Sequence, residues 1–395
     1  MSKKVLIVCY SYPPNPGVGG RKWAIFTQYL LNKGFEVHIL TKKPSPDSTS
    51  PWSEYTTGAI VHYFNNPYPK ILEMEPKSIC DKLTYKIALL FTKTFTKSNY
   101  YDRGVFSKRI IKNAITNIIE KYSIDNVIVS GAPFSFLHYA AQLKTKSASF
   151  NYVADIRDSW IKGNYFGFNS LGEKRKKNET EKLKKVLKNA DYVIVPNKEM
   201  FEDYVNMGST NTVLIPHAID EKLVLNKNIV HSEDFNMVCF GSLYNDLEMV
   251  FKRINDSIKN SQIKIQFYTN DRKYCKLLFE NVNYNSVVKQ DKVFEILSQC
   301  NAALFFVNDN IKNYISTKYM EAIASRTPIV LVGKKGIVSD FITSQCLGIF
   351  IEENDIAIQF SKLPNLVKEL KYNDKFNYEE YTFSYQTEKL IKLFI

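Results

Sequence analysis

Short apolar runs of strand length recur along the chain, and most of them are separated by segments long enough for a helix. The run Lys4–Tyr10 is apolar almost throughout, which predicts a parallel strand buried on both faces. Alternation of such strands with helices is typical of doubly wound α/β sheets. Further runs of this kind occupy residues 36–41, 59–64, 126–130, 150–154, 191–195, 235–240, 263–268, 302–307 and 328–332.

At 395 residues the chain is too long for one ordinary core, and we predict two domains. A new series of strands begins near Phe235, so the boundary is placed between Pro216 and Glu233. We predict an N-terminal domain over residues 1–220 and a C-terminal domain over residues 221–395, whose final helix is able to pack back on the first. Both are expected to be Rossmann-like parallel sheets that face each other across a cleft, because such sheets bind ligands at the carboxyl ends of their strands.

Composition excludes several classes of protein. No apolar run approaches the ~20 residues that span a bilayer. The N-terminus shows no signal-peptide pattern, so we expect a cytoplasmic protein. The six cysteines are scattered without C-x-x-C pairs or metal-ligand spacing, which favours buried, reduced thiols over a metal site.

The positive charge is confined to the first half of the chain. Up to Ile215 there are 31 basic and 18 acidic residues, whereas the rest of the chain is balanced. This asymmetry indicates an anionic partner. Nucleic acid is disfavoured because no recognised binding motif is present. In the segment Tyr85–Tyr122, lysine and arginine alternate with apolar residues, which is typical either of helices at an anionic membrane surface or of an ordinary solvated basic face.

A glycine-rich turn, SYPPNPGVGGRKW, links the first predicted strand to a helix expected over Lys22–Lys33. Glycines at such a turn let backbone amides approach an anion at the positive N-terminus of the helix. The alternative is a tight turn that only lets the helix pack on the sheet. Lys22 stands where the dinucleotide pattern G-x-G-x-x-G requires its third glycine, which disfavours a nicotinamide-dependent dehydrogenase.

Several segments, in order along the chain, resemble the family 4 glycosyltransferases. They include a segment, NYVADIRDSW, that is similar to the D-x-R-D-P-W motif of a bacterial envelope-polysaccharide branch, with Ser159 in place of proline. The other segments are YPPNPGVGGRKW, VSGAPFSFLHYAAQL, ADYVIVPNKEM, IPHAID, CFGSLY and YISTKYMEAIASRTPIV.

This resemblance implies the type B fold and transfer of a sugar, with retention of anomeric configuration, from a nucleotide diphosphate donor. The donor is expected to be a UDP- or GDP-linked sugar, with no metal and no other cofactor. Cations and helix termini would stabilise the leaving diphosphate, and Glu321 would bind the ribose hydroxyls. The alternative for Lys318 and Glu321 is a surface ion pair. The residues assigned to the donor are Gly19, Gly20, Arg21, Gly241, Ser242, Ser316, Thr317, Lys318 and Glu321.

The residues assigned to catalysis are His138, Asp155, Arg157 and Asp158. The three charged residues directly follow an apolar strand, where burial is costly unless the charges are paired. A structural network that holds the loop is therefore the alternative to a catalytic or acceptor-binding role. For His138 the alternative is a packed core histidine.

Two positions depart from the family pattern. Asn313 stands where many members carry the first glutamate of an E-x7-E pair. After the Gly-Ser-Leu segment, no cation appears before Lys252 and Arg253.

We therefore expect a peripheral membrane glycosyltransferase of lipopolysaccharide or capsule synthesis, which holds a lipid-linked glycan acceptor in its basic N-terminal half. The alternatives are an inactive type B partner subunit of another transferase and a nucleotide-sugar epimerase.

Overall fold

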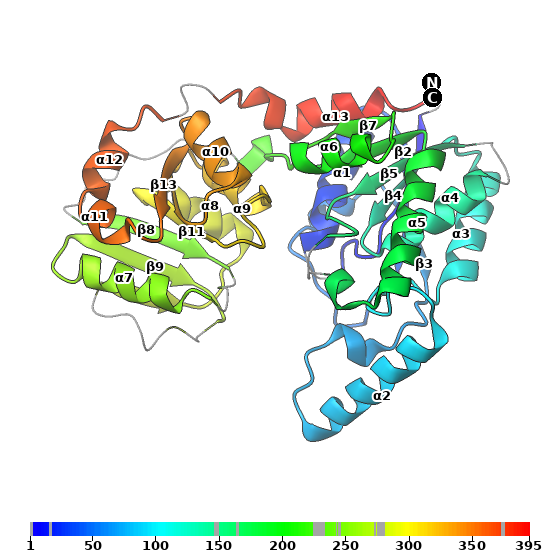
Figure 1. Cartoon of the computed structure of the whole chain (residues 1–395). Coiled ribbons are helices and arrows are strands. Elements are labelled where there is room, and N and C mark those ends of the chain that lie inside the picture. The colour runs from blue at the N-terminus through cyan, green and yellow to red at the C-terminus, as the bar shows by residue number, and fades with distance from the viewer. Residues whose placement is uncertain are drawn as a thin grey trace. The chain divides into compact units, whose positions relative to one another are not determined.

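The computed structural model describes residues 3–15, 18–145, 150–162, 166–223, 234–241, 243, 246–271, 274, 281–372 and 376–395. The chain forms two compact units (Figure 1). Unit 1 comprises Met1–Pro216 together with Ser384–Ile395, and unit 2 comprises His217–Phe383.

Unit 1 is built on a parallel sheet with the strand order β3-β2-β1-β4-β5-β6-β7. Strand β1 is central, with Val5 opposite Val37 on one side and Asn126 on the other. The connections therefore reverse direction between β1 and β4, which is the switch point where doubly wound sheets open a crevice. The strands are β1 (Lys4–Val8), β2 (Glu36–Lys42), β3 (Ile60–Phe64), β4 (Asn126–Gly131), β5 (Asn151–Ile156), β6 (Tyr192–Val195) and β7 (Thr212–Leu214).

Helices cover this sheet with regularly spaced apolar side chains. In α3 the buried residues are Ile111, Ile115 and Ile118, which recur once per turn on one face. Helix α1 ends just before Gly34, whose φ of +80° supplies the expected left-handed stop. The helices are α1 (Arg21–Asn32), α2 (Ile79–Phe95), α3 (Lys108–Tyr122), α4 (Phe134–Lys144), α5 (Glu173–Asn189), α6 (Lys198–Asn206) and α13 (Phe383–Ile391).

Unit 2 repeats the arrangement with the order β10-β9-β8-β11-β12-β13, so its switch point lies between β8 and β11. All six residues of β11 are buried. The strands are β8 (Phe235–Phe240), β9 (Ile263–Tyr268), β10 (Val282–Asn285), β11 (Ala302–Val307), β12 (Ile329–Gly333) and β13 (Gly348–Glu352). The helices are α7 (Glu248–Ile258), α8 (Gln290–Ser298), α9 (Thr317–Ala324), α10 (Ile337–Ser344), α11 (Ile356–Phe360) and α12 (Leu363–Glu369).

The structure confirms two Rossmann-like doubly wound parallel sheets and every strand expected from the apolar runs. The expectation of buried cysteines is confirmed for Cys9, Cys239 and Cys300, and it is wrong for Cys80, which is exposed in α2. Within the described ranges, no helix combines the length and the apolar character needed to cross a membrane.

The segment Ser384–Ile395 completes unit 1 from the far end of the chain. The Asn151 side-chain amide donates to the Leu393 carbonyl at 2.7 Å, and the Ile395 amide donates to the Asn126 side-chain oxygen at 3.0 Å. Phe394 packs edge-on against Phe35, with ring centroids 5.6 Å apart. Buried residues at the starts of three strands therefore hold this segment in place.

Candidate functional site

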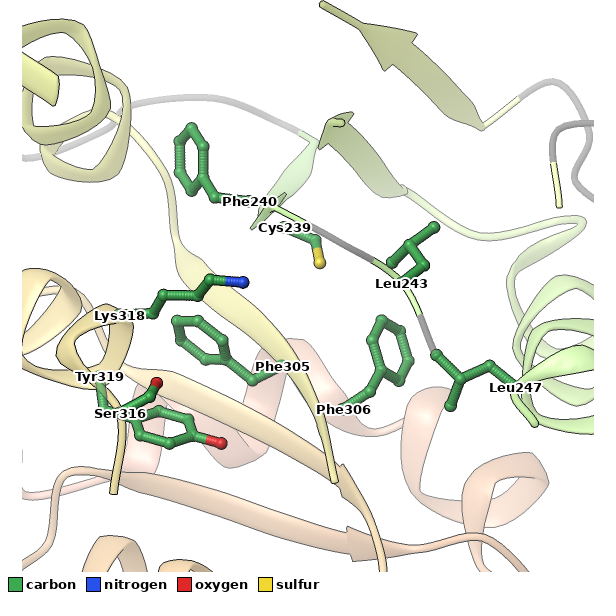
Figure 2. A pocket seen from close by; sticks show the side chains of 9 residues that line it. All are labelled: Cys239, Phe240, Leu243, Leu247, Phe305, Phe306, Ser316, Lys318 and Tyr319. Carbon is green, nitrogen blue, oxygen red and sulfur yellow. The ribbon is translucent and has the colours of Figure 1, made fainter. Parts of the chain in front are cut away.

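A cavity of about 90 Å³ lies within unit 2 at the carboxyl ends of β8 and β11, its switch point (Figure 2). Most of its wall is apolar, and its charged member is Lys318. The residues that line it are Cys239, Phe240, Leu243, Leu247, Phe305, Phe306, Ser316, Lys318 and Tyr319.

Lys318 extends from the first turn of α9 toward Cys239, as Figure 2 shows. The side chain is half-buried, and in the part of the chain that the structure describes, no acceptor or carboxylate pairs with its ammonium group. Burial raises the pKa of the Cys239 thiol to about 12, so this neighbour does not supply a negative charge. A cation without a partner against apolar walls is a favourable site for an anion, because pairing compensates its lost hydration.

The backbone favours glycine at position 241, just after β8. Its φ is +91°, a conformation that residues with a Cβ rarely adopt. The absence of a Cβ also leaves room for the Lys318 ammonium group, which lies directly beside this position. The structure thus brings together two residues that the sequence analysis assigned to the diphosphate and that lie far apart in the chain.

The N-terminus of α9 adds further hydrogen-bond donors to this cavity. Ser316 is the N-cap residue, but its side chain makes no capping hydrogen bond and instead lines the cavity. Its hydroxyl is therefore available to a ligand. Thr317 is the first residue of the helix, and Glu321, one turn later, is half-buried. Ser242 lies outside the described residues.

The residues that depart from the family pattern have other structural roles. The Asn313 side-chain oxygen accepts a hydrogen bond of 3.2 Å from the Ile337 amide, at the first turn of α10. Lys252 pairs with Glu248 at 2.8 Å. Arg253 donates to the carbonyl of Glu353 at 2.6 Å, beyond the end of β13. Asn313 therefore stabilises the fold, and both cations of α7 are engaged away from the cavity.

At the switch point of unit 1, the chain's own side chains pair with a fully buried carboxylate, that of Asp155. One of its oxygens accepts from the Lys22 ammonium at 2.8 Å. The other accepts from the Trp23 indole at 2.9 Å and the Ser130 hydroxyl at 2.7 Å. We call Lys22, Trp23, Ser130 and Asp155 the Asp155 cluster. Because both carboxylate oxygens accept hydrogen bonds from within the unit, the cluster fixes α1 to β4 and β5.

Hydrogen bonds also join Arg157 to the glycine-rich turn. The Arg157 guanidinium donates to the Gly131 carbonyl at 3.0 Å and to the Gly19 carbonyl at 2.5 Å. A Cβ on Gly20 would lie 2.6 Å from the Ser11 carbonyl oxygen, closer than such atoms can approach. Packing therefore explains the glycine at position 20. Contact of Gly19, Gly20 and the buried Arg21 with the donor stays a prediction.

Asp158 differs from Asp155 in having no hydrogen-bond donor among the described residues. Burial raises its pKa, and the neighbouring Arg157 opposes this shift. His138 lies in α4 and bonds to Gln142 at 2.8 Å through Nε2, while its Nδ1 is buried without a partner in the described part of the chain. Burial lowers the pKa of His138 to about 4, assisted by Lys182 and other lysines of neighbouring helices. The structure thus places His138 in the helical layer and not in the Asp155 cluster.

Sequence reasoning missed the aromatic walls of the cavity, chiefly Phe240, Phe305 and Phe306. They belong to strands that were expected, and aromatic residues at the carboxyl ends of strands beside a switch point are the signal that could have found them. Among the described residues, no group of three or more histidine, cysteine, aspartate or glutamate side chains is arranged to hold a metal ion.

No known family model matches this chain, and no curated protein sequence matches it either. Solved structures do match over nearly the whole chain. A glycosyltransferase from Rickettsia africae matches with a TM-score of 0.63 and 11% identity, over 99% of this chain and 97% of its own. A Listeria monocytogenes protein assigned as a UDP-N-acetylglucosamine 2-epimerase has a TM-score of 0.60 and 11% identity, over 99% of this chain and 95% of its own. HepE from Anabaena, solved with UDP and glucose, has a TM-score of 0.59 and 11% identity, over 98% of each chain. The two doubly wound sheets and these likenesses together give the chain the type B glycosyltransferase fold.

Proposed function

We propose that the chain is a retaining glycosyltransferase of surface polysaccharide synthesis, which takes a sugar from a UDP- or GDP-linked donor without a metal ion. The observation that carries this proposal is the unpaired Lys318 ammonium over Gly241, in a cavity at the switch point of unit 2. A diphosphate is the anion that this arrangement suits, because it offers several oxygens to the ammonium and to the amides that begin α9. The likeness to HepE, which was solved with UDP, supports the same assignment.

In the proposed reaction, the bond between the anomeric carbon and the donor diphosphate breaks, and negative charge develops on the leaving phosphate. Lys318 and the positive end of α9 stabilise that charge before any side chain has to move. The Ser316 hydroxyl, which caps nothing, adds a donor. We assign Glu321 to the ribose hydroxyls because its two carboxylate oxygens match a vicinal diol.

We assign the acceptor, a lipid-linked glycan, to unit 1. Both oxygens of the buried Asp155 carboxylate accept hydrogen bonds from within unit 1, so we assign it as a positioning group rather than a catalytic one. Asp158, whose carboxylate has no donor among the described residues, is the better candidate to contact an acceptor hydroxyl. The leaving diphosphate itself is the base that takes the proton from that hydroxyl.

A nucleotide-sugar epimerase is the second candidate, because the Listeria protein assigned to that activity has the same two-unit fold. The two activities differ in their products. An epimerase alters its donor in the absence of an acceptor, whereas a transferase releases nucleoside diphosphate in proportion to the glycan that is formed.

Calorimetric titration with UDP and GDP tests the donor site. We expect one of them to bind the wild-type chain, and Lys318→Met to weaken binding roughly 10- to 100-fold, as expected for loss of a charge-assisted contact. Lys252→Met removes a lysine that is paired in α7 and serves as the matched control, with binding unchanged.

Failure of the wild-type chain to bind any nucleotide or nucleotide sugar would overturn the proposal and favour the inactive partner subunit. If a nucleotide binds, incubation with the matching nucleotide sugar alone separates an epimerase from a transferase.

A further inference from the structure

Helix α2 presents an apolar face that the described residues of unit 1 leave largely exposed, although Phe91 contacts Phe106. Six of its large apolar side chains are between 50% and 86% exposed. Helix α3, which is nearly as long, instead buries Ile111, Ile115 and Ile118. The exposed side chains of α2 are Ile79, Leu83, Ile87, Leu90, Phe91 and Phe95.

These side chains form one continuous face. Successive residues of an α-helix are about 100° apart, so the six side chains span an arc of about 160°. The other residues within this arc are Cys80, Thr84 and Thr94, and none of the nine is charged. The Thr84 hydroxyl donates to the Cys80 carbonyl at 2.9 Å, and the Thr94 hydroxyl donates to the Leu90 carbonyl at 2.8 Å. The face can therefore leave water without losing a hydrogen bond.

The opposite side of α2 is fixed to unit 1. Thr92 is fully buried, and Leu89 packs against the cluster of Tyr100, Phe168 and Leu171. Arg175 of α5 donates to the carbonyl of Lys93 at 2.6 Å and so anchors the last turn. Figure 1 shows the rest of the helix lying apart from the sheet of its unit. The apolar face is thus held outward by specific contacts at one end of the helix.

Charge along one flank of this face distinguishes between possible occupants. Lys82, Lys86 and Lys93 lie within about 60° of its edge. The acidic residue of the helix, Asp81, lies in its first turn and accepts from the amides of Lys77 and Ser78, so its carboxylate serves as part of the N-terminal cap. A second copy of α2 would bring a lysine row against an equally basic surface. Anionic phospholipid complements the lysines and accepts the apolar residues.

We propose that α2 docks unit 1 on an anionic lipid surface, with its apolar face in the boundary between headgroups and acyl chains and its lysines among the headgroups. The excess positive charge of the chain up to Ile215 acts in the same direction. This inference is independent of the proposed activity, because it requires neither a donor nor an acceptor.

Co-sedimentation of the full chain with vesicles of phosphatidylcholine, with and without phosphatidylglycerol, tests this docking. We expect binding to the anionic vesicles that weakens with salt. The double variant I87Q/L90Q should lower the partition coefficient about tenfold or more, because two apolar side chains no longer enter the bilayer. The control M249Q/I358Q alters two side chains of unit 2 that are 59% and 63% exposed, and it should bind as wild type does.

A fluorescence measurement locates the contact. Trp23, Trp52 and Trp160 are all buried, so a tryptophan introduced by Phe91→Trp reports on the exposed face alone. Anionic vesicles should shift its emission to the blue and shield it from iodide.

Equal vesicle binding by I87Q/L90Q and by wild type would overturn the assignment to α2. Failure of the wild-type chain to bind anionic vesicles would overturn the proposal that lipid is the partner. If that chain instead forms a dimer that I87Q/L90Q dissociates in light scattering, the occupant is a second copy. Nucleotide titration of the same samples separates these outcomes from failure of the proposed function.

Discussion

The two units share one strand order around a central strand, yet the crevices at their switch points differ. In unit 1, Lys22 is paired with one oxygen of a fully buried carboxylate, and a tryptophan and a serine donate to the other oxygen. In unit 2, Lys318 faces a cavity of about 90 Å³ and has no partner among the described residues. The same topology thus supports a crevice filled by paired side chains in one unit and a cavity with an unpaired lysine in the other, and the difference lies in which side chains fill the crevice.

Replacing each lysine by methionine gives the largest contrast. Lys22→Met should lower the free energy of unfolding by about 3–5 kcal/mol, because it leaves the buried Asp155 carboxylate without its cation. Lys318→Met should change it by no more than about 0.5 kcal/mol, since no ion pair is lost. Urea denaturation of both variants measures the two values. Similar decreases in the free energy of unfolding for the two variants would mean that the two lysines have the same structural role, which would contradict this comparison.

The dependence of the free energy of unfolding on pH tests whether unit 1 also buries His138 in its neutral form. The pKa of this residue is about 4 in the folded chain and near 6.5 when unfolded. Between these values the unfolded chain binds a proton that the folded chain does not, so the stabilising effect of neutral His138 is present above pH 6.5 and is lost as the pH falls. Wild type should therefore lose up to about 1.4 kcal/mol per pH unit relative to His138→Gln over this window.

Urea denaturation of wild type and His138→Gln at several pH values between 7 and 4 measures this difference. Parallel curves would mean that folding does not shift the pKa of His138, which would contradict its packed, neutral state.

The smallest effect concerns Asn313, which occupies the position of a family carboxylate. Asn313→Ala should cost about 1 kcal/mol of stability, because the first turn of α10 loses a hydrogen-bond acceptor. Nucleotide affinity should not change. If the variant keeps its thermal midpoint but binds nucleotide more weakly, Asn313 contacts the ligand. Its assignment as a purely structural residue would then be wrong.

Much of the fold could be predicted from the sequence, because buried parallel strands are apolar runs and the turns between them are short. Strands β7, β10 and β13 were missed. All three lie at sheet edges, and two of them have weak patterns: β7 has three residues, and β10 reads VNYN. Neighbouring strands rather than local sequence stabilise such segments.

The site was predictable only in part. Resemblance to a family indicated Lys318 and Gly241, but their proximity depends on the path of the backbone between β8 and α9. Likewise, α2 and α3 both showed an apolar period within one basic segment. Which of the two faces the core is decided by tertiary packing, and a periodicity cannot reveal it.

The return of residues 384–395 to unit 1 has a consequence for biosynthesis. A ribosome delivers residues 1–216 first, but the partners of Asn126 and Asn151 emerge only after unit 2 has been made. Unit 2 is contiguous and can fold while it leaves the ribosome, whereas the first-made unit must wait with the starts of its strands uncovered. The order of completion is therefore the reverse of the order of synthesis, because unit 1 is completed only after residues 384–395 have been made.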